Sequence, residues 1–193
     1  EGWDWGCSHS LDVRLAWNAT RLGPVCLSDA YPTKAFHFNH DEKEIRREPS
    51  GDGAGGSDAR LGGLVATRDG FMMTFASPQG RSSTDVGILR IGNDASVGAV
   101  TWLTNTPDVD EDGPHLASYG TGLLATWVAG GEHLAMLLDA TGQPAGEPVA
   151  LGARIAPKDD MLGGLPGGDV LWAVAGPRPG LLRVARLDYC QPR

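Results

Sequence analysis

The sequence has 193 residues, including 28 glycines and 13 prolines; together these take up roughly 21% of the chain, where an average protein has roughly 12%. The glycines follow no three-residue period, which excludes collagen, and no stretch reaches the ~20 apolar residues of a membrane helix. The formal net charge is -8, and no stripe of lysine and arginine offsets it. We therefore expect a turn-rich globular domain without a membrane span and without a nucleic-acid partner.

The first 60 residues are predicted to be irregular, with one hairpin. Residues 12–17 and 24–28 read as its two strands, and they could form the front of a further repeat. Residues 41–48 are a charged run with helical spacing, which we expect to be a solvated helical turn or a loop. Residues 50–58 are rich in glycine and predict a flexible loop.

Three similar runs follow, and they begin at residues 70, 122 and 169, so that their offsets are 52 and 47 residues. Each run has a short strand before it, at 61–65, 115–119 and 161–165. Each also has a third strand after it, at 85–91, 133–139 and 181–187. A fourth strand is readable in the first two units, at 99–104 and 148–151. A period near 50 residues with four short strands is typical of propeller blades.

The repeats predict one all-β, β-propeller-like domain over residues 1–193, with about four blades of four short antiparallel strands. The blade repeats span 61–104, 115–151 and 161–190, and residues 1–60 hold a partial blade. The domain would be a small closed ring or part of a larger propeller, and a β-sandwich is the alternative fold. The last repeat has no clear fourth strand, so we expect a strand from elsewhere to complete it.

The second strands share the pattern Gly-apolar-apolar-x-Thr-aromatic, and residues 8–15 and 28–32 add two further segments. In these features the chain resembles the degenerate blades of secreted bacterial β-propeller repeat proteins. The resemblance implies a secreted protein, extracellular or periplasmic. Because the WD, kelch and NHL signatures are absent, it carries no activity over.

The three cysteines fit none of the C-x-x-C motifs of zinc ribbons and redox proteins. In an oxidising compartment two pairings compete: Cys7–Cys26 would staple the first hairpin, and Cys7–Cys190 would tie the chain ends together. Asn18 begins an Asn-Ala-Thr glycosylation acceptor. The sequence begins at Glu1 without a methionine or signal peptide, and we expect a mature form or a fragment.

Two clusters of metal-ligand residues are candidates. Asp108, Asp110 and Asp112 precede Gly113 in a D-x-D-x-D-G pattern, the front half of a calcium loop. The twelfth position is Tyr119 instead of glutamate, which excludes an EF-hand and leaves a shorter calcium loop or a plain acidic turn. His37 and His40, with His9, are a candidate transition-metal site or a solvated loop.

Aromatic residues gather near the N-terminus, and we take Trp3, Trp5 and Tyr31 as candidate ligand-binding residues for a glycan. No arrangement of nucleophile and base stands out. We therefore expect a non-catalytic binding or structural module that contacts a glycan, another protein chain or a copy of itself. The alternative is a propeller-type hydrolase or lyase whose acids line the axis. Calcium is the one cofactor that the sequence points to.

Overall fold

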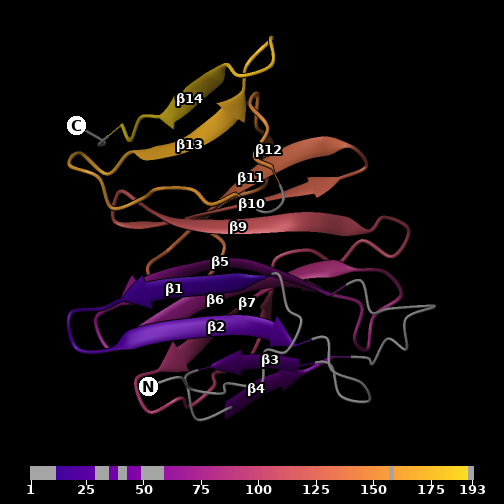
Figure 1. The fold of residues 1–193 in the computed structure, drawn as a ribbon. Helices are drawn as coiled ribbons and strands as arrows, with labels where there is room; N and C mark the ends of the chain where they lie inside the picture. The colour runs from indigo at the N-terminus through magenta and orange to yellow at the C-terminus, as the bar shows by residue number, and fades with distance from the viewer. Residues whose placement is uncertain (1–11, 29–34, 39–42, 49–58, 157–158, 191–193) are drawn as a thin grey trace.

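The computed structural model describes residues 12–28, 35–38, 43–48, 59–156 and 159–190. These residues form fourteen β-strands and no helix (Figure 1). The strands of the first sheet are β1 (Val13–Trp17), β2 (Leu22–Ser28), β3 (Ala35–Phe38) and β4 (Lys43–Arg47). Those of the second sheet are β5 (Arg60–Thr67), β6 (Gly70–Ser77), β7 (Asp85–Gly92) and β8 (Thr101–Trp102). Those of the third are β9 (Glu111–Tyr119), β10 (Gly122–Ala129), β11 (Glu132–Leu138) and β12 (Val149–Ala150), and those of the fourth are β13 (Val170–Ala175) and β14 (Leu182–Leu187).

Each sheet is an antiparallel meander in which strands that follow one another in the sequence lie side by side. The first three sheets have four strands each, and the fourth pairs β13 with β14. An isolated bridge joins Leu162 to Leu171 on the other edge of β13. The all-β prediction is confirmed for the described residues, which form four separate sheets instead of the two of a sandwich.

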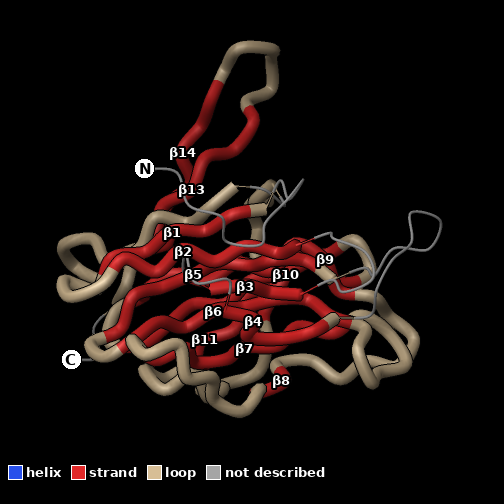
Figure 2. Tube along the Cα trace, turned by 60° about the horizontal axis from the view of Figure 1, so that its bottom comes forward, coloured by secondary structure: helices blue, strands red, loops and turns tan. Residues whose placement is uncertain are grey.

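The four sheets stack in chain order, from β1–β4 to β13–β14 (Figure 1). The first strands of neighbouring sheets lie next to each other: β5 contacts β1 on one side and β9 on the other, and β9 also contacts β13. The β13–β14 hairpin projects beyond the rest of the stack (Figure 2). Whether the sheets belong to a closed propeller stays a prediction.

Apolar residues fill the layer between each pair of consecutive sheets, which gives three separate cores. The second strands explain this arrangement because both of their faces are buried. In β6, Phe71, Met73 and Phe75 pack in the first core, whereas Met72 packs in the second. This is the near-continuous apolar pattern of a strand buried on both faces. Because successive side chains of a strand point to opposite faces, this one strand contributes to two cores.

The N-terminal part is more regular than the sequence indicates. The expected hairpin is present as β1 and β2, in register from Val13 opposite Cys26 to Trp17 opposite Leu22. Residues 43–47 form the strand β4, so the expectation of a helical turn or loop is wrong there. The reason is that Ile45 is buried in the first core, while β4 pairs with β3 as the outermost strand of its sheet. Charged residues are common on such an edge because they discourage pairing with other chains.

Candidate functional site

A polar cluster lies where the first strands of the sheets meet. Arg14 of β1 is only 8% exposed, and its Nε lies 2.8 Å from Oδ1 of Asp160. Asp160 belongs to the connection that leads from the third sheet to the fourth, so this ion pair joins the first sheet to that connection. A buried arginine needs such a partner because an uncompensated charge away from water costs several kcal/mol.

His115 of β9 is the most deeply buried titratable group of this cluster, with 1% of its surface exposed. Among the described residues, neither ring nitrogen makes a hydrogen bond of normal geometry. Burial lowers the pKa of His115 to about 4, Arg14 and His133 add repulsion, and the Asp159 backbone and Asp112 partly oppose the shift. At pH 7 the imidazole is therefore neutral.

A pocket of about 630 Å³ lies beside this cluster, between the third sheet, the fourth sheet and their connection. Its polar lining residues are Asp112, His133, Arg154 and Asp159. His133 is 9% exposed, and its Nδ1 accepts a hydrogen bond of 3.4 Å from the backbone N–H of Ile155. Burial, followed by the charge of Arg154, lowers the pKa of His133, so its neutral form carries the proton on Nε2.

This pocket holds carboxylates and a histidine, as the hydrolase alternative requires. Among the residues placed by the structure, however, no carboxylate forms a hydrogen bond with His115 or His133. The two aspartates of the pocket, Asp112 and Asp159, are exposed to solvent. The arrangement therefore offers polar binding groups, without the oriented base that nucleophilic catalysis uses.

A second polar network lies between the second and third sheets. Arg81 forms an ion pair with the buried Asp85 and stacks 4.2 Å from the ring centroid of Trp102. Thr104 donates to Asp85 or Glu111, with distances of 3.0 and 3.1 Å. The pKa of Glu111 is raised, chiefly because the carboxyl is buried. Each polar group of this network has a partner, and its role is to fix the two sheets together.

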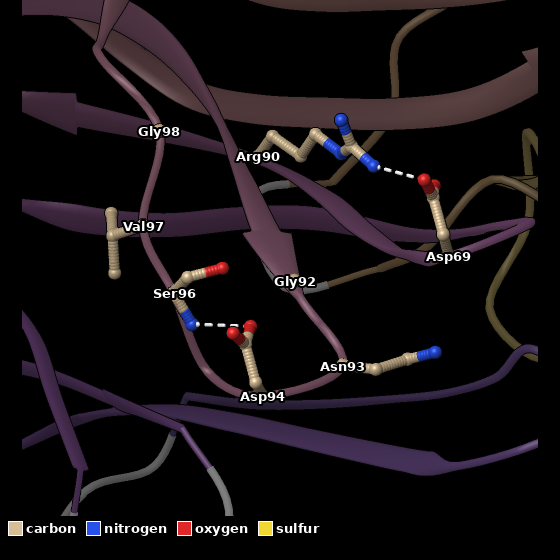
Figure 3. Close-up of a pocket in the computed structure, with 8 residues that line it drawn as sticks. All are labelled: Asp69, Arg90, Gly92, Asn93, Asp94, Ser96, Val97 and Gly98. Atoms are coloured by element: carbon tan, nitrogen blue, oxygen red, sulfur yellow. Dashed lines mark hydrogen bonds and ion pairs between the residues drawn. The ribbon is translucent and has the colours of Figure 1, made fainter.

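A further hollow of about 510 Å³ lies at the turn after β7 (Figure 3). Asp69 and Arg90 form an ion pair of 2.5 Å on its wall, and the Ser96 backbone N–H donates to Asp94 Oδ1 at 3.0 Å (Figure 3). Hydrogen bonds from Ser96, chiefly from its side chain and then from its backbone, lower the pKa of Asp94. Because its charged groups are paired or satisfied by the turn itself, this hollow is part of a stable turn.

The structure does not bring the three candidate calcium ligands together. Asp110 Oδ1 accepts a hydrogen bond of 2.7 Å from the Thr84 N–H, and Asp112 lies 3.5 Å from Arg60. No group of three or more histidine, cysteine or acidic residues in the described ranges could hold a metal ion. Two of the three carboxylates of the predicted loop thus bind protein donors, and calcium binding at Asp108, Asp110 and Asp112 stays a prediction.

Several other predicted residues fall partly or wholly outside the described ranges. His37 lies in β3, opposite Cys26 and Glu44, whereas His40 and His9 are not described, so that pair stays untested. Trp3, Trp5 and Tyr31 are also outside the described residues. Their assignment to a glycan stays a prediction.

The cysteines behave differently from each other. Cys26 is fully buried and disulfide-bonded, whereas Cys190 is free and exposed. The pairing of Cys7 with Cys190 is therefore at odds with the structure. The pairing of Cys7 with Cys26 stays a prediction, because Cys7 lies outside the described residues.

The glycosylation candidate Asn18 has a structural role in the β1–β2 turn. Its Nδ2 donates to the Gly70 carbonyl at 3.2 Å and to Asn93 Oδ1 at 2.7 Å. Its Oδ1 accepts from the backbone N–H groups of Thr20 and Arg21. The side chain thus joins the first sheet to the second, and a glycan on Nδ2 would compete with these hydrogen bonds.

Sequence reasoning missed the inner polar cluster, although the sequence contains a signal for part of it. The tripeptide His-Leu-Ala occurs twice, at 115–117 and 133–135, and both copies lie in the third sheet. A polar residue repeated within apolar strands indicates a position with a specific partner or role. The ion pair of Arg14 with Asp160 had no such signal, because its partners lie 146 positions apart in the chain.

Comparisons with known proteins place the chain in no established group. No protein-family model matches the sequence, and no curated protein matches it. Within the part that the structure describes, no helix is long and apolar enough to cross a membrane. The function must therefore be argued from the geometry.

Proposed function

We propose that this chain is a secreted, propeller-like binding and structural module whose series of sheets is completed by a second copy of itself. The observation that carries the proposal is the position of the exposed apolar residues. Of the eleven large hydrophobic residues exposed in the described part, six belong to the first or the last sheet of the series, and two more, Leu162 and Leu181, flank the last sheet. The six are Val13, Leu15, Trp17, Leu22, Leu182 and Val184.

The last sheet exposes positions that are buried in the sheets before it. Val184 stands at the place in its repeat that Ile88 and Ala135 hold in theirs, judged by the paired strands. Ile88 is 1% and Ala135 4% exposed, because the following sheet covers them, whereas Val184 is 67% exposed. A further sheet packed here would remove this surface from water, at about 25 cal/mol per Å² of apolar area.

The first sheet also exposes apolar residues, along β1 and at the start of β2. Val13, Leu15 and Trp17 alternate along β1 and therefore lie on one face, and Leu22 is directly opposite Trp17. The other face of this sheet packs in the first core. Alternating apolar residues without cover mark an interaction surface.

A second copy fits both surfaces at once. The last sheet of one copy would pack on the first sheet of the next, which is a head-to-tail contact between two different patches. Such contacts close into a ring when the rotation per copy allows it. Two copies would supply about eight sheets, within the roughly 4–8 blades of known propellers.

The secreted location is supported by the disulfide at Cys26, because disulfides persist in oxidising compartments. Peptide mapping of the unreduced protein tests it. The proposal expects a Cys7–Cys26 cross-link and a free Cys190. A fully reduced protein purified from its natural compartment would contradict the location.

Self-association tests the proposed function. By light scattering after size-exclusion chromatography, we expect a mass of about twice the 20.3 kDa of one chain. Leu15→Asp and Val184→Asp should each weaken the assembly at least about tenfold, because each places a charge in an apolar contact. Leu137→Asp is the matched control: Leu137 is 48% exposed, but it belongs to the third sheet. A monomeric native chain, or equal effects of all three variants, would overturn the proposal.

A further inference from the structure

The outer edge of the fourth sheet differs from the outer edges of the other three. In those sheets a fourth strand pairs with the outer edge of the third one: β4 pairs with β3, β8 with β7, and β12 with β11. In the described part of the chain, β14 has β13 on one side and no strand on the other. The backbone of a strand in this position presents unpaired N–H and C=O groups.

The edge of β14 is also less protected than the other edges, because it is longer than β8 and β12 and its charges are confined to two arginines among exposed apolar residues. β8 and β12 have two residues each, and β4 carries Lys43, Glu44 and Arg47. Short or charged edge strands are the usual means by which proteins prevent unwanted pairing. β14 has six residues, and Leu182 and Val184 are each 67% exposed. It is therefore the described edge best suited to accept another strand.

We propose that β14 binds an extended segment by antiparallel strand addition, with a register that the other sheets define. In the second sheet, Trp102 lies opposite Gly87 and Thr101 opposite Ile88. In the third, Ala150 lies opposite Leu134 and Val149 opposite Ala135. Arg183 and Val184 hold the corresponding places in β14, so the added strand pairs with these two residues.

The side chains of β14 define the chemistry of the segment. Arg183 is exposed, and no described residue forms an ion pair or hydrogen bond with its side chain. Arg186, by contrast, is held by Asp169 at 2.5 Å and Asp188 at 2.6 Å. Opposite charges in directly opposed positions stabilise a strand pair. The segment therefore has an acidic residue opposite Arg183, preceded by a β-branched residue opposite Val184.

The test uses a synthetic peptide of residues 98–104 with Trp102→Glu, titrated into the ¹⁵N-labelled full chain. This peptide places Thr101 opposite Val184 and the glutamate opposite Arg183. We expect amide shifts confined to β14 and its neighbours. A peptide with Trp102→Lys should bind about threefold more weakly, as expected for an exposed cross-strand charge pair. Absent binding, or shifts elsewhere in the fold, would overturn the proposal.

Charge reversal on the protein completes the test. In Arg183→Glu the peptide preference should invert, so that the lysine peptide binds better than the glutamate peptide. Arg183 is exposed, and amide spectra will show that this variant keeps its fold. An unchanged preference would contradict the register. The inference does not depend on self-association, because the titration is repeated in Leu15→Asp, where the edge should bind the peptide equally well.

Discussion

His115 shows how far one residue can depart from its ordinary chemistry in this fold. Its ring is buried between the third and fourth sheets, and Thr126, directly opposite in the β9–β10 ladder, also has a buried hydroxyl with no hydrogen-bond partner in the part of the chain that the structure describes. Such groups are uncommon in folded proteins. A neutral imidazole tolerates this environment, whereas an imidazolium near Arg14 does not.

The pH dependence of stability follows from this environment. The pKa of His115 is about 4 in the folded chain and about 6.5 in the unfolded chain, so the unfolded chain takes up the proton first. The stability is therefore complete above about pH 6.5 and falls as the pH drops toward 4. We expect a loss of about 2 kcal/mol between pH 7.5 and pH 5 from this residue, measured by urea unfolding. In His115→Leu most of this loss should vanish, and an undiminished loss would contradict the assignment.

Metal removal should have no effect on the described fold. Asp110 accepts a hydrogen bond from the Thr84 N–H, and Asp112 forms an ion pair with Arg60. We therefore expect these protein donors to compete with a cation for both carboxylates. We expect the melting temperature to be the same with excess EDTA and with added calcium. A rise of several degrees on adding calcium would show that the loop at 108–113 binds it after all.

At the scale of single residues, the sequence predicts a site only where its pattern is local. The D-x-D-x-D-G pattern at 108–113 is local, yet the fold turns two of its carboxylates to protein donors. The inner cluster is the opposite case: Arg14 and Asp160 meet because four sheets stack in order. No spacing of residues along the chain predicts that contact.

The strands were predictable where both faces are buried. The runs beginning at residues 70 and 122 form β6 and β10, the second strands of their sheets, as the repeat indicates. The run beginning at residue 169 forms β13, but the strand expected before it at 161–165 is present only as the isolated bridge from Leu162 to Leu171. β3 and β4 were not predicted from the sequence. β3 does contain a period-two signal, since Phe36 and Phe38 are two positions apart and both are fully buried. The charged neighbours of Ile45 hid β4, since one buried residue among charges fits a helix or a strand equally well.

Close packing of the first strands predicts a sensitive glycine. A Cβ on Gly63 of β5 would overlap the backbone nitrogen of Leu116 in β9, so Gly63→Ala must push the second and third sheets apart. We expect a loss of at least about 2 kcal/mol of unfolding free energy, measured by chemical denaturation.

Gly152→Ala is the matched control for this substitution. A Cβ there meets no atom within 4 Å, and the backbone needs no positive φ. Its effect should stay within about 0.5 kcal/mol. Equal stabilities of the two variants would mean that β5 and β9 are not in close contact.

Across the whole molecule, three apolar layers lie between the four sheets, and the first and last sheets each have one face without a neighbouring sheet in the described part of the chain. Consecutive sheets bury an apolar layer between them, and the first and last sheets each keep large apolar residues exposed. A repeat whose unit cannot bury its own faces requires neighbours on both sides. The sequence predicts the units, and under our proposal a second copy of the chain supplies the missing neighbours.

The assembled particle itself provides the most direct test. Electron microscopy of the purified native assembly should show sheets arranged radially about one axis, with the last sheet of each copy packed on the first sheet of the next. A single stack with both apolar ends free in solution, or copies joined through their second and third sheets, would contradict the account.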